Sequence, residues 1–194
     1  MKFLILLFFI TSSIFATSIN DSLLRVHATL VPKLYLMDHA YIEKIKDNSI
    51  VIAIIYNQSD YKSALSLKNK IDSKYHQGLK TYHIETQLLL YSDIQNSDAN
   101  IYYLFPSKSK NIKTAIKKAS KNQALTFSYL KDDLKHGVMI SLSIGIKVKP
   151  ILNLDAIKSH NISFRPILLN ISNIYAIKQY KPLSYIDNTK MVSV

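Results

Sequence analysis

The sequence predicts an α/β protein: a mostly parallel sheet with helices on both faces and a C-terminal β-hairpin that adds an antiparallel edge. Continuous apolar runs at residues 50–56 and 101–105 are typical of strands buried on both faces. Amphipathic segments of helical length alternate with such runs through the first two-thirds of the chain, which is the order of a parallel sheet with crossover helices. Near the C-terminus, two apolar runs separated by Gly145 predict the hairpin.

The first predicted helix covers residues 22–38, where apolar side chains recur at helical spacing. The stripe comprises Leu23, Val26, His27, Leu30, Leu34 and Met37. Pro32 lies within this helix and has no amide hydrogen to donate, so we expect it to kink the helix or divide it. After the strand at residues 50–56, Ser59 is expected to cap a second helix that continues to about Tyr75.

The middle of the chain continues the alternation. A short strand is predicted at residues 80–85, and residues 86–100 are interpreted as a helical turn followed by a loop. After the strand at 101–105, Ser107 is expected to cap a helix whose lysines face solvent. A fourth strand is predicted at residues 124–127, followed by a polar helical turn.

The C-terminal third begins with two long apolar runs and ends with short helical segments. Residues 138–144 and 146–154 predict two long strands with a tight turn at Gly145 between them. A short helix is predicted at residues 155–160, and a last helix has Pro166 in its first turn, where a missing N–H costs nothing. We expect this last helix to be buried through Leu168, Leu169 and Ile171.

The first sixteen residues have the layout of a secretory signal peptide. Lys2 supplies one positive charge, residues 3–10 are apolar, and a small and polar stretch leads to Ala16, after which we expect cleavage. The apolar run is shorter than the ~20 residues that a membrane span needs. An uncleaved N-terminal anchor is the alternative interpretation. Because no cysteine follows the apolar run, we expect no lipid-modified N-terminus, and we expect the mature protein to be exported.

The composition is that of a globular protein, with 48% hydrophobic and 20% charged residues. We expect a single domain over residues 17–179 and a flexible tail over 180–194. Without cysteines, the core must be held by burial alone. The net charge of +12 indicates a solvated basic surface, or attraction to an acidic partner or an anionic membrane face. Export and the presence of only two arginines, Arg25 and Arg165, argue against nucleic acid as a partner.

The sequence shows no recognisable catalytic or cofactor-binding constellation. Residues 141–145 come nearest to a Gly-x-Ser-x-Gly elbow but lack its first glycine, and three scattered glycines cannot build a dinucleotide fingerprint or a P-loop. Asp132 and Asp133 are interpreted as part of a short helix. We therefore predict no enzyme, no cofactor and no metal site. None of the histidines pair at the spacing of a metal-binding helix: His27, His39, His76, His83, His136 and His160.

A block of short motifs lies between residues 136 and 171. It begins with His136-Gly137-Val138-Met139-Ile140, continues with Asn153-Leu154-Asp155-Ala156, and ends with Ile162-Ser163 and Leu168-Leu169. This block resembles the YfiR-like family of periplasmic proteins. We expect mainly structural roles for its residues, with partner contact as the alternative: Gly137 at a positive φ, Asn153 and Ser163 as helix caps, and the leucines in packing. The motif positions are Gly137, Met139, Ile140, Asn153, Leu154, Ala156, Ser163, Leu168 and Leu169.

The resemblance implies a non-enzymatic regulator. Such a protein binds the periplasmic sensor part of an inner-membrane diguanylate cyclase or histidine kinase and shifts its activity, with cyclic-di-GMP and biofilm behaviour downstream. The resemblance also allows a homodimer. A periplasmic small-solute-binding protein is the alternative, with a polar cleft at the carboxyl ends of the strands, after Tyr56, Glu85 and Phe105.

Overall fold

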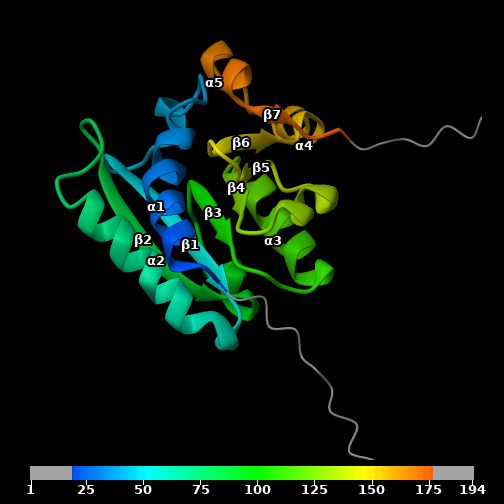
Figure 1. Ribbon diagram of the computed structural model, residues 1–194. Coiled ribbons are helices and arrows are strands. Elements are labelled where there is room, and N and C mark those ends of the chain that lie inside the picture. Colours follow the sequence, from blue (N-terminus) through cyan, green and yellow to red (C-terminus); the bar gives the residue numbers. More distant parts are fainter. Residues whose placement is uncertain (1–18, 177–194) are drawn as a thin grey trace, which may run out of the picture.

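The computed structural model describes residues 19–176, which build one seven-stranded sheet flanked by helices (Figure 1). The strand order is β2-β1-β3-β4-β5-β6-β7. Strands β1 to β5 are mutually parallel, β6 is antiparallel to β5, and β7 is parallel to β6. The predicted α/β class and mostly parallel sheet are confirmed. The expected signal peptide, residues 1–16, and the expected tail, residues 180–194, lie outside the described residues.

The central strands β1, β3 and β4 are mostly apolar and buried on both faces, as their apolar runs predict. Every residue of β3 and β4 is buried, and β1 has a single partly exposed position, Val51. The strands are β1 (Ser49–Tyr56), β2 (His83–Leu90), β3 (Ile101–Leu104), β4 (Leu125–Ser128), β5 (Ile140–Ser143), β6 (Lys149–Leu152) and β7 (Asn173–Ile174).

Two helical layers cover the sheet. The α-helices are α1 (Asp21–Tyr35), α2 (Tyr61–Lys74), α3 (Ser109–Lys121), α4 (Leu154–Ser159) and α5 (Pro166–Ile171). The 3-10 helices are η1 (Ile42–Lys44), η2 (Gln58–Asp60), η3 (Tyr91–Asn96) and η4 (Lys131–His136). Helices α1 and α2 pack beside each other on one face, together with the buried residues of α4 and α5, whereas α3 and η3 cover the other face (Figure 1).

Alternation along β1 divides the core between these two layers. Ile52 and Ile54 point toward α1 and α2, whereas Ala53 and Ile55 point toward α3 and η3. Successive side chains of a strand face opposite sides, so a run of consecutive apolar residues supplies both layers at once. Within residues 19–176, no helix has the length and hydrophobicity that crossing a membrane requires.

Helix α1 is continuous and is not divided at Pro32. Its N-cap is Asn20, whose Oδ1 accepts a hydrogen bond from Leu23 N at 3.2 Å. Of the predicted stripe, His27 and Leu34 are buried, whereas Leu23, Val26, Leu30 and Met37 are only partly buried. The core face is displaced toward Leu24, Ala28 and Val31, which are buried. The displacement arises because α1 packs against both the sheet and α2. Helical spacing in the sequence does not predict which elements a helix contacts.

Two predicted helix caps are wrong. Helix α2 begins after η2, so Ser59 lies within a 3-10 turn, and α3 has Lys108 at its N-cap position. Ser107 instead donates its hydroxyl to Asn57 Oδ1 at 3.2 Å and accepts from Asn111 Nδ2 at 2.9 Å. The hydroxyl is therefore used in linking the loop after β3 to the loop after β1.

The predicted second strand is displaced toward the C-terminus. Leu79 and Tyr82 bridge a turn in which Lys80 has a φ of 58°, and β2 then runs from His83 to Leu90 through a segment predicted as helical turn and loop. β2 is the edge of the sheet, and its side chains alternate between exposed and partly buried. This half-polar pattern explains why the strand gives no continuous apolar signal.

The predicted hairpin is present, but its strands are short. Strands β5 and β6 pair over four residues each, from Ile140 opposite Leu152 to Ser143 opposite Lys149. The helix predicted at residues 155–160 is α4, and the last predicted helix is α5 with Pro166 at its start. β7 was not predicted; it pairs with β6 and forms the outermost strand beyond the hairpin.

One histidine is enclosed between α1 and the sheet. His27 is 1% exposed and packs against the rings of Tyr103, Phe127 and Tyr129. Its Nδ1 is hydrogen-bonded to the Tyr103 hydroxyl at 2.6 Å, and its Nε2 has no partner among the described residues. Burial lowers the pKa of His27 from 6.5 to about 4, so the ring is neutral in the folded protein at neutral pH.

We predict that this histidine destabilises the fold in acid. Between pH 6.5 and about 4 the unfolded chain binds a proton at His27 and the folded chain does not, so the free energy of unfolding falls by up to about 3 kcal/mol across this window. Denaturant melts of the parent and of His27→Gln at several pH values measure it; the variant should lack most of this slope. His76→Gln, at an exposed position, should keep the slope. An equal slope in parent and His27→Gln would contradict the prediction.

Candidate functional site

The motif block 136–171 begins at the turn between η4 and β5. Gly137 ends η4 with a φ of 102°, as expected, and its N–H donates to Leu134 O at 3.1 Å. A Cβ at this position would meet only Ile116 Cδ1, at 3.7 Å, so the backbone conformation is what favours glycine here. Met139 and Ile140 follow as buried core residues.

Asn153 connects three elements at the end of β6. Its Oδ1 accepts from Ala156 N at 3.1 Å and so caps α4, as expected. Its Nδ2 donates to Leu134 O in η4 at 2.8 Å, and its backbone N–H donates to Met139 O at 2.9 Å. The side chain is 4% exposed. Both ends of the amide are therefore used internally, and Asn153 has a structural role.

The other two expected roles are only partly present. Ser163 does not cap a helix, because the N-cap position of α5 is Arg165. Ser163 is held through its backbone, which donates to Asp38 Oδ1 at 3.3 Å and accepts from His39 N at 2.8 Å. Of the paired leucines, Leu168 is 1% exposed and Leu169 is 39% exposed. The remaining motif residues, Leu154 and Ala156, are partly buried and buried.

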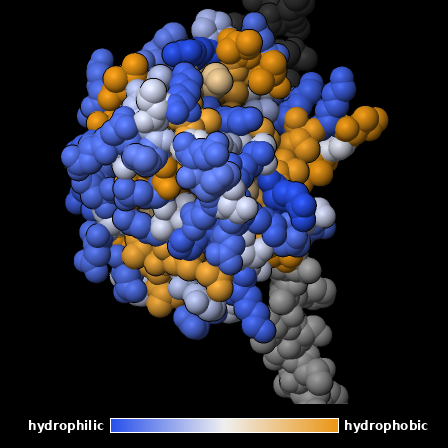
Figure 2. Space-filling view, turned by 90° about the vertical axis from the view of Figure 1, so that its left-hand side faces the viewer, coloured by the Kyte–Doolittle hydropathy of each residue, from blue (hydrophilic) through white to orange (hydrophobic). Residues whose placement is uncertain are grey.

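The α5–β7 surface, which we define as Ile167, Leu169, Ile171 and Ile174, is apolar and exposed. The exposed fractions of Ile167 and Ile171 are 62% and 54%, and these two residues are four positions apart on one side of α5. Sequence periodicity predicted Leu169 and Ile171 to be buried, which is wrong: a helix of six residues turns only a narrow side toward the core, and Leu168 occupies it. Figure 2 shows hydrophobic side chains gathered at the top of the molecule, the end at which Figure 1 places α5.

The α5–β7 surface has a rigid foundation. Arg165 N donates to Met37 O at 2.9 Å, and Phe164 forms an isolated bridge with Asp38. Asp38 is buried and pairs with Lys44, with 2.5 Å between Oδ2 and Nζ. Through these contacts the segment leading into α5 is fixed to the chain after α1. The exposed isoleucines therefore stand on an ordered support, and exposed apolar groups of this kind mark interaction surfaces.

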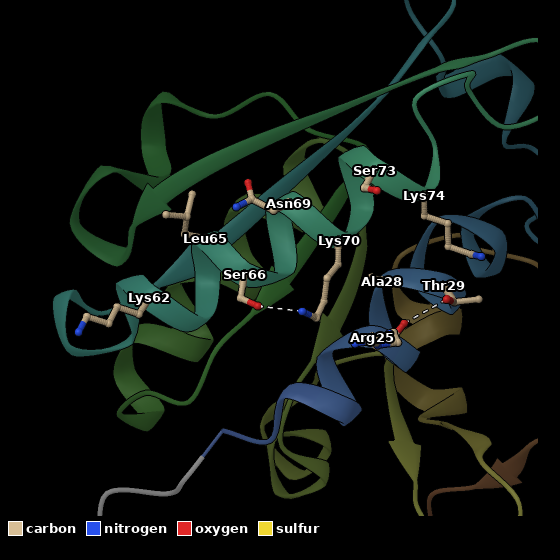
Figure 3. Close-up of a pocket in the computed structure, with 10 residues that line it drawn as sticks. All are labelled: Arg25, Ala28, Thr29, Lys62, Leu65, Ser66, Asn69, Lys70, Ser73 and Lys74. Atoms are coloured by element: carbon tan, nitrogen blue, oxygen red, sulfur yellow. Dashed lines mark hydrogen bonds between the residues drawn. The ribbon is translucent and has the colours of Figure 1, made fainter.

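A groove of about 880 Å³ lies between α1 and α2 (Figure 3). Its cations are Arg25, Lys62, Lys70 and Lys74, and Figure 3 shows Ser66 and Lys70 directed toward each other along α2. Lys70 also pairs with Asp21 at 2.9 Å, and its hydrogen bond lowers the pKa of the Asp21 carboxyl. The groove is open to solvent. The groove is a basic surface between packed helices.

The carboxyl edge of the sheet has a different character from the cleft that a solute-binding protein needs. Strand order reverses between β1 and β3, which is where such folds bind ligands. Here Asn57 Nδ2 donates to Pro106 O at 2.7 Å, which joins the loops after these two strands. The Tyr91 hydroxyl donates to Phe105 O at 2.6 Å. The strand end expected at Glu85, after which the cleft was predicted, is wrong, because β2 continues to Leu90.

Residues 19–176 contain no group of three or more side chains that could hold a metal ion. The Asp133 carboxyl accepts from Ser128 Oγ at 2.5 Å, and burial raises its pKa. His160 Nδ1 lies 2.7 Å from Ala156 O and 3.0 Å from the Ser159 hydroxyl, so this ring closes the end of α4. Asp133 and His160 thus have structural partners.

Comparisons with known proteins agree with this organisation. A family model described as YfiR/HmsC-like matches residues 42–173. No curated protein matches the chain. The fold resembles a conserved domain protein from Vibrio cholerae, with 12% identity and a TM-score of 0.56 over 78% of this chain and 59% of that one.

Two further structures share the fold over 78% of this chain, both at 9% identity. One is the ABC domain in complex with L-Trp from Streptococcus pneumoniae, with a TM-score of 0.54 and 62% of its length covered. The other is the ligand-free, open form of a substrate-binding protein with adhesive properties from Clostridium difficile, with a TM-score of 0.53 and 59% covered. The chain thus spans about three fifths of the length of these structures, and the likeness concerns the fold alone.

We predict that Asn153→Ala costs about 2 kcal/mol or more of folding free energy. The change removes a helix cap and leaves the buried Leu134 carbonyl without this donor. Asn20→Ala is the matched control, because Asn20 also caps a helix but at an exposed site; it should cost about 1 kcal/mol. Chemical denaturation of both variants measures the difference. Equal losses would show that the second hydrogen bond of Asn153 contributes little.

Proposed function

Because the chain belongs to the YfiR/HmsC-like family, we propose that it is an exported, non-enzymatic regulator of an inner-membrane signalling enzyme. It binds the periplasmic part of a diguanylate cyclase or a histidine kinase and shifts the activity of that enzyme. The observation that supports this proposal is the α5–β7 surface, which exposes four apolar side chains on an ordered support within the family-matched region or at its edge.

The mechanism is differential binding. A sensor domain that exists in two conformations is shifted toward the one that the regulator binds more tightly. A tenfold preference for one conformation corresponds to about 1.4 kcal/mol. Burying an isoleucine side chain contributes about 1.5–3 kcal/mol when it is fully exposed beforehand, so Ile167 and Ile171, each about half exposed, supply enough for such a preference.

The α5–β7 surface favours a protein partner over a small solute. Exposed isoleucines on a convex helix suit a complementary apolar surface. The alternative function, solute binding, has less support because Asn57 and Pro106 join the loops at the crevice where a ligand would enter. A thermal-shift screen against metabolites tests the alternative, and strong stabilisation by one compound would favour it.

The experiment that tests the proposed function is deletion of the coding sequence. Loss of the regulator should change cellular cyclic-di-GMP or the output of a membrane kinase, and the chain should co-purify with that membrane protein from envelope extracts. Unchanged signalling under several envelope stresses, together with failure to recover a membrane signalling protein, would refute the proposal.

We predict that Ile167→Asp combined with Ile171→Asp abolishes complementation of the deletion. Two carboxylates on the α5–β7 surface cannot be buried against an apolar partner, whereas the change costs the fold little because both side chains are exposed. Cyclic-di-GMP or kinase output is the readout, and thermal melting checks folding. Ile42→Asp is the control, because Ile42 is 59% exposed outside this surface and should complement normally. Normal complementation by the double variant would contradict the proposal that α5 contacts the signalling partner.

A further inference from the structure

The loop that joins β5 to β6 carries a second group of exposed apolar side chains. Ile144, Ile146 and Val148 are 61%, 106% and 38% exposed, although each is a large aliphatic residue. The value for Ile146 means that its side chain is as open to solvent as in an extended peptide. Apolar residues so placed are not explained by packing within residues 19–176.

Cations alternate with these apolar residues. Lys147 and Lys149 are exposed, and neither pairs with a carboxylate in the part of the chain that the structure describes. A Cβ built at Gly145 would meet no atom within 4 Å, so this turn stands free of the domain. We call residues 144–149 the hairpin tip.

The hairpin tip is presented on a firm base. Its last residue, Lys149, pairs with Ser143 in the β5–β6 ladder, and the next pair, Leu142 and Pro150, is buried. Because β5 runs parallel to β1, β3 and β4, the tip projects from the carboxyl edge of the sheet. A short apolar and cationic projection is therefore held at a fixed place on the domain.

We propose that the hairpin tip inserts into the interfacial region of an anionic phospholipid bilayer. The isoleucines would enter the boundary between headgroups and acyl chains, and the lysine ammonium groups would lie among the lipid phosphates. The acyl boundary of a bilayer accepts a single apolar projection, whereas a stable protein interface buries about 800 Å² on each partner, more than the hairpin tip alone offers.

The charge of the chain supports an anionic bilayer as the occupant. The chain has 25 Lys and Arg against 13 Asp and Glu, and the hairpin tip itself contains lysines without acidic residues. Lysine attracts phospholipid headgroups as a point charge and needs no fixed geometry, which suits a fluid surface. This inference does not rest on the proposed regulatory function, because it concerns lipid alone.

A tryptophan placed in the hairpin tip tests insertion directly. The chain contains no tryptophan, so Ile146→Trp gives a single reporter in the full-length chain. We expect a blue-shifted emission, and quenching by brominated lipid, on addition of phosphatidylglycerol vesicles but not of phosphatidylcholine vesicles. Ile42→Trp, at a similarly exposed isoleucine elsewhere, should show neither change. Absence of a shift in Ile146→Trp, or an equal shift in both variants, would overturn the proposal.

Vesicle co-sedimentation separates the hairpin tip from the general positive charge. Lys147→Gln with Lys149→Gln should weaken binding to phosphatidylglycerol vesicles about tenfold or more. Lys113→Gln with Lys117→Gln removes the same charge from exposed positions of α3 and should have a much smaller effect. All variants share residues 3–10, so any membrane affinity of that apolar run is common to them. Equal losses from the two double variants would refute a specific role of the tip.

Discussion

The burial of the central parallel strands on both faces is the constraint on which the structure depends. Ile52, Tyr103 and Phe127 are each 0% exposed and pack in one layer, whereas Ala53, Tyr102 and Leu104 pack in the opposite layer and are also buried. A parallel sheet of this kind must be covered on both sides. Helices α1 and α2 cover one side, and α3 with η3 covers the other. Their inward faces are therefore committed to the core, and the lysine-rich outer face of α3 is what remains toward solvent.

Exposed apolar side chains consequently concentrate where the parallel layer ends. Beyond β5, the last of the parallel strands, the sheet continues as β6 and β7, and the short elements α4 and α5 cover this end with few side chains. The α5–β7 surface and the hairpin tip both belong to this end of the sheet. Folding does not require either group of side chains to be exposed, since polar residues would be tolerated at these positions. Because folding does not require these side chains to be apolar, their apolar character indicates that they bind something outside the fold.

The sequence contains enough information for the class of fold but not for its exposed apolar positions. Continuous apolar runs identify β1 and β3 because these strands are buried on both faces. The bounds of β2 were not predicted, because this edge strand is half polar. Ser107 resembles a helix cap in sequence, yet its hydroxyl bonds to Asn57, a residue 50 positions away. Ile144 extends the apolar run of β5, and no local pattern indicates that strand pairing stops at Ser143. The wrong cap at Ser107 thus arises from a distant contact, whereas the other two failures arise where the sheet has its edge or strand pairing ends.

The aromatic layer beneath α1 shows how a chain without cysteines builds a firm core. Tyr103 stacks on Phe127 with ring centroids 5.5 Å apart, and Phe105 stacks on Tyr129 at 6.2 Å. Such pairs contribute about 0.5–1.5 kcal/mol beyond the area that they bury. The same layer encloses His27 and leaves its Nε2 without a partner among the described residues, which has an energetic cost. Stability at neutral pH and sensitivity to acid therefore have the same structural origin.

The positions of the two exposed surfaces also bear on how weak contacts could suffice for regulation. The hairpin tip begins β6, whereas β7 pairs with Ile151 and Leu152 at the other end of that strand. One strand thus fixes the geometry between the two surfaces. A domain held at a bilayer by its tip would present α5 in a limited range of orientations, and its concentration near a membrane-bound partner would be raised without any new contact to that partner. Neither surface alone would then need the area of a permanent protein interface.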